Sequence, residues 1–82
     1  MEVMQRIPAI AARMGKCRTV LYEDAKRGLL TKWVKLGPRS VGLPASEVTA
    51  LLNARIAGAT DQQLKDLVQR LMAERLARSP KL

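Results

Sequence analysis

The first apolar residues of the chain recur at the spacing of one helix face. They lie three or four positions apart: Ile7, Ile10, Ala11 and Met14. This period predicts an amphipathic helix that buries one side. Pro8 fits the first turn of such a helix, where its missing N–H had no partner to lose. Gly15 can end the helix as a left-handed residue.

A second short helix is predicted over residues 17–27, with Val20 and Leu21 facing the core and Gly28 closing it. The two helices are joined by about two residues around Gly15, which is the arrangement of a helix-turn-helix. Leu21 then fills the space between the helices. A plain pair of antiparallel helices fits the same pattern, so both interpretations stand at this point.

The pattern changes to strand formers in residues 29–43. The residues that favour strands there are Trp33, Val34, Leu36 and Val41. The sequence Gly37-Pro38-Arg39 interrupts this run, which predicts two short strands joined by a tight hairpin. A basic hairpin that follows a helix-turn-helix is a wing. We expect Trp33 to pack against the helices, with base stacking as the alternative.

Two further helices are predicted after the hairpin. The first opens at Pro44 and Ser46-Glu47 and ends at Gly58, and its core stripe is Val48, Leu51, Leu52 and Ile56. Thr60 and Gln63 form a capping box for the second. This last helix covers residues 61–77 and carries the longest apolar stripe of the chain, namely Leu64, Leu67, Val68, Leu71, Met72 and Leu76.

The fold class predicted from these elements is mostly α with a small β-hairpin. The arrangement is a winged helix-turn-helix followed by a C-terminal helix. Residues 1–58 form the winged helix-turn-helix DNA-binding domain, and residues 59–82 form an amphipathic helix with a short tail. A chain of 82 residues supports one modest core, and with no Phe, one Trp and one Tyr that core is filled by aliphatic side chains.

The composition excludes several kinds of chemistry. The chain has no His and one Cys, which rules out a structural zinc site and a Cys–His or Ser–His catalytic pair. The only adjacent carboxylates, Glu23 and Asp24, point about 100° apart on a helix and do not share a face. We therefore expect no catalytic residues, no metal and no cofactor, and a protein that is not an enzyme.

The charge points to a polyanionic partner. The 15 basic and 7 acidic residues give a net charge of +8. Between Lys16 and Arg39 there are seven basic residues and two acidic ones, or +5. Nucleic acid and an acidic membrane both qualify. The last helix carries Asp61, Asp66 and Glu74 on its polar face, which suits anionic lipid poorly. We expect no membrane span, no signal peptide and a cytoplasmic, nucleoid-associated bacterial protein.

Several motifs together resemble a known family. They are Arg6-Ile7-Pro8, Ile10-Ala11, Gly15, Arg18-Thr19-Val20-Leu21-Tyr22, Gly28, Val34-Lys35-Leu36-Gly37-Pro38-Arg39, Val41 and Ser46-Glu47-Val48. This order resembles the AlpA family of small phage and genomic-island regulators, which have a MerR-like winged helix-turn-helix. The resemblance covers about Arg6 to Ile56. It implies double-stranded DNA binding, for transcriptional regulation or as an excisionase, a recombination directionality factor that assists a phage-type integrase.

The candidate DNA contacts lie on the second helix and the wing. They are Lys16, Arg18, Thr19, Tyr22, Lys32, Lys35 and Arg39. A recognition helix enters the major groove with its N-terminal end foremost, and an Arg there can pair bidentately with guanine, so Arg18 is the expected base reader. On the wing, Lys35 and Arg39 are expected on the DNA backbone or in the minor groove. A solvated strand face explains Lys32 and Lys35 equally well.

Contacts between copies are expected because one small module binds DNA weakly by itself. The last helix offers four residues for this role, Leu64, Leu67, Leu71 and Met72. The alternative is that this stripe covers the chain's own third helix and wing. Cys17 is expected to be a small buried residue.

The leading functional hypothesis is a sequence-specific DNA-binding protein of a phage or mobile element. It acts as a transcriptional regulator, an excisionase or both, and assembles in several copies on DNA. The alternative is a protein-interaction module, such as an antirepressor that docks on an acidic partner. Salt-dependent binding to duplex DNA of random sequence separates the two hypotheses.

Overall fold

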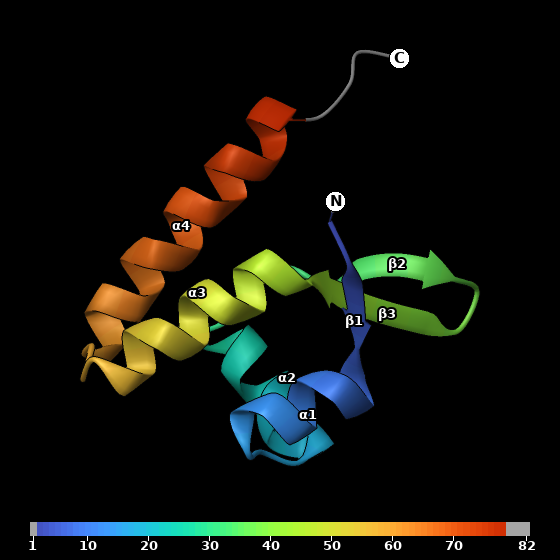
Figure 1. Cartoon of the computed structure of the whole chain (residues 1–82), viewed down its shortest axis with the longest axis horizontal. Coiled ribbons are helices and arrows are strands. Elements are labelled where there is room, and N and C mark those ends of the chain that lie inside the picture. Colours follow the sequence, from blue (N-terminus) through green and yellow to red (C-terminus); the bar gives the residue numbers. More distant parts are fainter. Residues whose placement is uncertain (1, 79–82) are drawn as a thin grey trace.

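The computed structural model describes residues 2–78, which contain four helices and three strands. In chain order these are β1 (Met4–Arg6), α1 (Ile7–Met14), α2 (Arg18–Lys26), β2 (Val34–Gly37), β3 (Ser40–Pro44), α3 (Ala45–Ile56) and α4 (Asp61–Arg78), as Figure 1 shows. The described chain is mostly helical with one small antiparallel sheet. The prediction of a mostly α fold with a small β-hairpin is confirmed at this level. No helix within residues 2–78 has the length and apolar character needed to cross a bilayer.

The helix ends follow the local signals of the sequence. Gly15 ends α1 with a φ of 66°, and its N–H donates to the carbonyl of Ala11. Thr60 and Gln63 form the predicted capping box at the start of α4. The Thr60 N–H donates to Gln63 Oε1 at 2.8 Å, and the Gln63 N–H donates to Thr60 Oγ1 at 3.2 Å.

The sheet has a third strand that the sequence pattern does not predict. Its order is β1-β3-β2, so β3 lies in the middle and pairs with both neighbours in antiparallel fashion. Strand β1 pairs Arg6 with Gly42 and Met4 with Pro44. A three-residue strand is too short to show an alternating pattern of its own, and this one exists only through its pairing with a segment far along the chain.

Gly42 allows β1 and β2 to approach β3 closely. A Cβ at this position would lie 2.5 Å from the carbonyl oxygen of Gln5 and 2.9 Å from Leu36 Cδ1. Real Cβ atoms do not approach a backbone oxygen so closely, so the third strand requires glycine here.

The core joins all four helices to the sheet. Its fully buried aliphatic residues include Ile10, Leu21, Leu43, Val48, Leu51 and Leu64. Leu64 and Val68 of α4 belong to this same cluster. Burial of such a side chain contributes roughly 1.5–3 kcal/mol. The last helix is therefore part of the core that it shares with residues 1–58.

Two predicted core positions are wrong. Ile56 is 76% exposed and Leu76 is 74% exposed, although both continue an apolar stripe. Ile56 is the final residue of α3, where the chain turns toward α4, and Leu76 lies in the last turns of α4, where no neighbouring element covers its side chain. Helical period identifies a face, but it does not say how far along that face the neighbouring element reaches.

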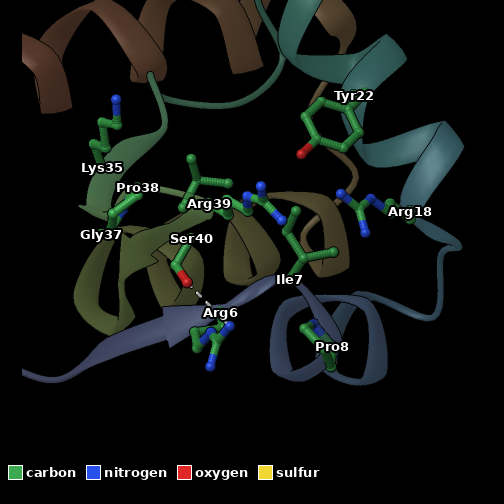
Figure 2. Close-up of a pocket in the computed structure, with 11 residues that line it drawn as sticks. Arg6, Ile7, Pro8, Arg18, Tyr22, Lys35, Gly37, Pro38, Arg39 and Ser40 are labelled. Atoms are coloured by element: carbon green, nitrogen blue, oxygen red, sulfur yellow. Dashed lines mark hydrogen bonds between the residues drawn. The ribbon is translucent and has the colours of Figure 1, made fainter.

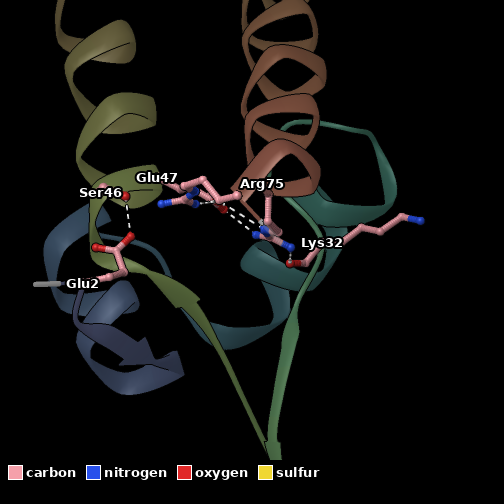
Figure 3. Close-up of polar contacts among 6 residues, drawn as sticks. Glu2, Lys32, Ser46, Glu47 and Arg75 are labelled. Carbon is pink, nitrogen blue, oxygen red and sulfur yellow. Dashed lines mark hydrogen bonds and ion pairs between the residues drawn. The ribbon is translucent and has the colours of Figure 1, made fainter. Parts of the chain in front are cut away.

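A buried ion pair links α4 to α3. The Glu47 side chain is 2% exposed, and the Arg75 guanidinium binds it in a bidentate manner, with Nε donating to Oε2 at 3.1 Å and Nη2 donating to Oε1 (Figure 3). Arg75 Nη1 also donates to the carbonyl of Lys32 at 3.0 Å. Arg78 Nη2 lies 3.7 Å from Glu47 Oε2. One carboxylate thus ties α3, α4 and the segment before β2 together.

We expect Arg75→Met to lower the free energy of unfolding by about 3 kcal/mol, because removing one partner leaves a buried charge with poor compensation. Urea unfolding followed by circular dichroism measures the change. Arg70→Met, at an exposed position of the same helix, is the control and should stay within about 0.5 kcal/mol of the parent. Equal stability of the two variants would contradict a structural role for the Glu47–Arg75 pair.

Gly42→Ala should lower the free energy of unfolding by roughly 1–3 kcal/mol, because the added methyl group must push β1 or Leu36 away. Gly37→Ala is a matched control in the same sheet, since the nearest atom to a Cβ there is the Ser40 Cβ at 4.0 Å. Thermal unfolding of both variants tests the close approach. If both variants melt at the same temperature, the pairing of β1 with β3 is not as tight as described.

Candidate nucleic-acid interface

A cleft of about 350 Å³ lies between the first turns of α1 and α2 on one side and the β2–β3 hairpin on the other (Figure 2). Its lining residues are Arg6, Ile7, Pro8, Arg18, Tyr22, Lys35, Gly37, Pro38, Arg39, Ser40 and Val41. Four of them are basic and none is acidic. The cleft is therefore a concentrated positive surface.

The α2 side of the cleft is formed by Arg18 and Tyr22. These residues are four positions apart on one helix face, and the Arg18 guanidinium carbon lies 5.6 Å from the centre of the Tyr22 ring. Tyr22 in turn contacts Trp33, with ring centres 5.4 Å apart and planes tilted by 50°. The Arg18 guanidinium therefore packs on the Tyr22 ring, which Trp33 holds in place, and this contact limits where the guanidinium can lie.

The opposite side is formed by the hairpin and by the end of β1. Arg39 lies in the turn between β2 and β3, and Figure 2 shows its side chain reaching toward Arg18 across the cleft. Lys35 lies on β2. Arg6 approaches along β1, and its Nη2 donates to Ser40 Oγ at 3.2 Å.

This convergence of cations has an electrostatic consequence. Like charges that share a cleft repel one another, and no carboxylate in the lining offsets them. An anion placed between Arg18 and Arg39 relieves that repulsion. Helix α2 adds a second attraction, since Cys17 provides no side-chain cap for its first turn, where N–H groups favour negative charge. The chemistry of the cleft is that of an anion-binding site.

The structure brings together four of the seven predicted contacts, Arg18, Tyr22, Lys35 and Arg39. Thr19 is exposed beside Arg18 in the first turn of α2, outside the lining residues. Lys32 is also exposed but lies outside the cleft, where its carbonyl accepts from Arg75 (Figure 3).

Lys16 has a partner inside the protein. Its Nζ binds Oδ2 of Asp24, a side chain that is 6% exposed, and Arg55 Nη2 lies 3.5 Å from the same oxygen. A buried carboxylate needs such partners. The position of Lys16 is thus explained without DNA. The prediction of a buried Cys17 is wrong, because the thiol-bearing residue is exposed at the N-cap of α2, where the chain is still extended.

Arg6 is the cleft residue that sequence reasoning misses. The charge of Arg6 does not identify it as a cleft residue, because Arg6 precedes the first predicted helix and lies outside the basic segment between Lys16 and Arg39. Only the pairing of β1 with β3 places it beside the hairpin, opposite Gly42. A strand predicted before Pro8 would have identified it.

The four residues assigned to contacts between copies lie mainly against the chain's own core. Leu64 is 1% exposed, while Leu67, Leu71 and Met72 are partly buried and pack on the core cluster. The alternative, that the stripe covers the chain's own domain, accounts for Leu64. Assembly of several copies stays a prediction.

Comparison with known proteins gives one related sequence. No protein-family model matches the chain, and no solved structure is found to be similar. The chain is 37% identical over 57 residues to a protein of Enterobacteria phage P4 described as uncharacterized protein ORF88. The matched stretch covers 70% of this chain and 65% of the phage protein. A related sequence therefore exists in a phage, and the chain spans just under two thirds of its length.

Proposed function

We propose that the chain binds double-stranded DNA through the basic cleft and that α1, α2 and the β2–β3 hairpin act as a winged helix-turn-helix. The observation that carries this proposal is the convergence of Arg6, Arg18, Lys35 and Arg39 on one cleft whose lining includes no carboxylate. DNA presents phosphates at regular spacing on both sides of a groove. Basic side chains on both sides of the cleft, one at a helix end and the others on the hairpin and β1, complement that pattern.

In this docking the N-terminal end of α2 enters the major groove and the hairpin follows the adjoining backbone. Arg18 reads a base, because its guanidinium can pair bidentately with guanine O6 and N7. The contact with Tyr22 favours this role, since a supported guanidinium loses less freedom on binding than a free one. Lys35, Arg39 and Arg6 neutralise phosphates and set the orientation of the protein on the duplex.

The biological role that fits this activity is control of a phage or mobile element. We propose a transcriptional regulator, an excisionase that assists a phage-type integrase, or both, acting in the bacterial cytoplasm on the nucleoid. The related protein of phage P4 supports the mobile-element setting. The motifs that resemble the AlpA family support a winged helix-turn-helix that binds DNA. One small module buries roughly 600–1,000 Å² on DNA, so we propose that several copies load together on repeated sites.

Affinity for duplex DNA of random sequence should fall steeply with salt. If the four cleft cations each neutralise one phosphate, the logarithmic slope is about −3.6, which is roughly a 150-fold loss between 50 and 200 mM salt. Fluorescence anisotropy with a labelled duplex measures this slope for a single bound copy. An affinity that does not change over that range would refute binding through the cleft cations.

Arg18→Ala and Arg39→Ala should differ in how they affect sequence specificity. On a site selected from a random duplex pool, Arg18→Ala is expected to cost roughly 1–3 kcal/mol, with a much smaller loss on random DNA. Arg39→Ala removes the same charge and should weaken both DNAs alike. Arg70→Ala, on α4 and away from the cleft, controls for net charge. Equal losses for Arg18→Ala on both DNAs would make it a phosphate contact.

A further inference from the structure

A second concave surface lies on the face formed by α2, the segment before β2 and α4. Two cavities of about 410 and 420 Å³ adjoin there, because both are lined by Ala25, Leu30 and Lys32. We call the two neighbouring cavities together the α2–α4 groove. It meets the DNA cleft only at Tyr22, which lines both.

The floor of the α2–α4 groove is apolar. Leu30 and Val68 are buried at its base, and Met72 and Trp33 form half-buried walls. Leu76 stands at the rim and is 74% exposed. An apolar floor with a large exposed aliphatic side chain at its edge is a surface that a partner's apolar residues can cover.

The rim of the groove is positive. Lys26 and Lys32 are exposed and line it, and no acidic residue does. Lys65 adds to this edge, since its Cγ lies 3.8 Å from where a Cβ would stand on Gly28. The groove therefore offers apolar contacts below and cations at the side. The chemistry that complements it is an apolar residue flanked by carboxylates.

DNA and a second copy of the chain fit this groove less well. A duplex presents phosphates and sugars, which make no favourable contacts with an apolar floor. A second copy of the chain carries the same net charge of +8, so it is repelled from a basic rim. An acidic segment of a different protein meets both the floor and the rim.

We infer that the α2–α4 groove docks an acidic segment of a partner protein, whose spaced apolar residues pack on Trp33, Met72 and Leu76 while its carboxylates pair with Lys26 and Lys32. This site shares only Tyr22 with the basic cleft, so we expect the protein to hold DNA and the partner at the same time. The proposed site also assigns a role to Lys32, which lies outside the cleft.

Trp33 provides a direct readout of this groove. It is the only Trp of the chain and lies in the groove wall, so its fluorescence reports what binds there. The probe is a synthetic amphipathic peptide with leucine at alternating third and fourth positions and glutamate between them. The control is a scrambled peptide of the same composition and charge, and the titration is run at about 0.15 M salt, where distant charges are screened.

We expect the amphipathic peptide to change Trp33 fluorescence and to bind at least about tenfold more tightly than the scrambled peptide. Leu76→Glu should weaken its binding about tenfold or more. Ile56→Glu changes another aliphatic residue that is three-quarters exposed but lies outside the groove, so it should stay within about twofold. Both sites are exposed, and thermal unfolding confirms that both variants remain folded.

Charge variants separate this site from the proposed DNA site. Lys26→Gln with Lys32→Gln should weaken peptide binding about tenfold and leave binding to random duplex DNA within about threefold. Lys35→Gln with Arg39→Gln removes the same charge from the cleft and should do the reverse. Failure of the unmodified protein to bind duplex DNA, with its peptide binding intact, would overturn the proposed function and leave the groove assignment standing.

Three results would overturn the groove assignment. One is equal binding of the amphipathic and scrambled peptides, which would reduce the interaction to net charge. Another is competition between the peptide and duplex DNA for the same protein, which would place the peptide in the cleft. A third is a Trp33 response to anionic lipid vesicles in the absence of any response to the peptide, which would make the groove a lipid site.

Discussion

A carboxylate buried as deeply as that of Glu47 is tolerated only with cationic partners, and its partners come from the far end of the chain. Arg75 reaches it from α4 and also donates to the carbonyl of Lys32. The segment next to Lys32 carries Trp33, which contacts Tyr22, and Tyr22 lies under Arg18. The pair therefore fixes the last helix and, through this segment, supports the aromatic residues beneath the cleft.

The parts of this fold that the sequence predicts are those determined locally. Gly15, Thr60 and Gln63 specify helix ends through contacts within a few residues, so the helices and the hairpin are predicted with nearly correct bounds. Strand β1 depends on hydrogen bonds to residues almost forty positions away and leaves no local pattern. The exposure of Ile56 and Leu76 depends on where neighbouring elements stop, which helical period does not encode.

The residues of the candidate site also divide into those that local structure predicts and those that depend on distant contacts. Arg18 and Tyr22 share a face of one predicted helix, and Lys35 and Arg39 lie on one predicted hairpin, so their grouping follows from local structure. Lys16 is basic like them, yet a buried Asp24 holds it, and a count of charges does not distinguish a paired lysine from a free one. The apolar stripe of the last helix cannot be assigned from the sequence for the same reason, because an amphipathic helix can pack on its own core or on a second copy.

The close packing at Gly42 has a consequence for how related sequences can diverge. Arg6 lies opposite Gly42 in the sheet, and a slip of one residue in this pairing would turn the Arg6 side chain to the other face. Insertions within β1 are therefore expected to be excluded among descendants that keep the cleft. The turn at Pro38 and Arg39 has no such constraint, because exposed hairpin tips accept length changes. Variation in the length of this tip can change how far Arg39 reaches across the cleft while the scaffold stays the same.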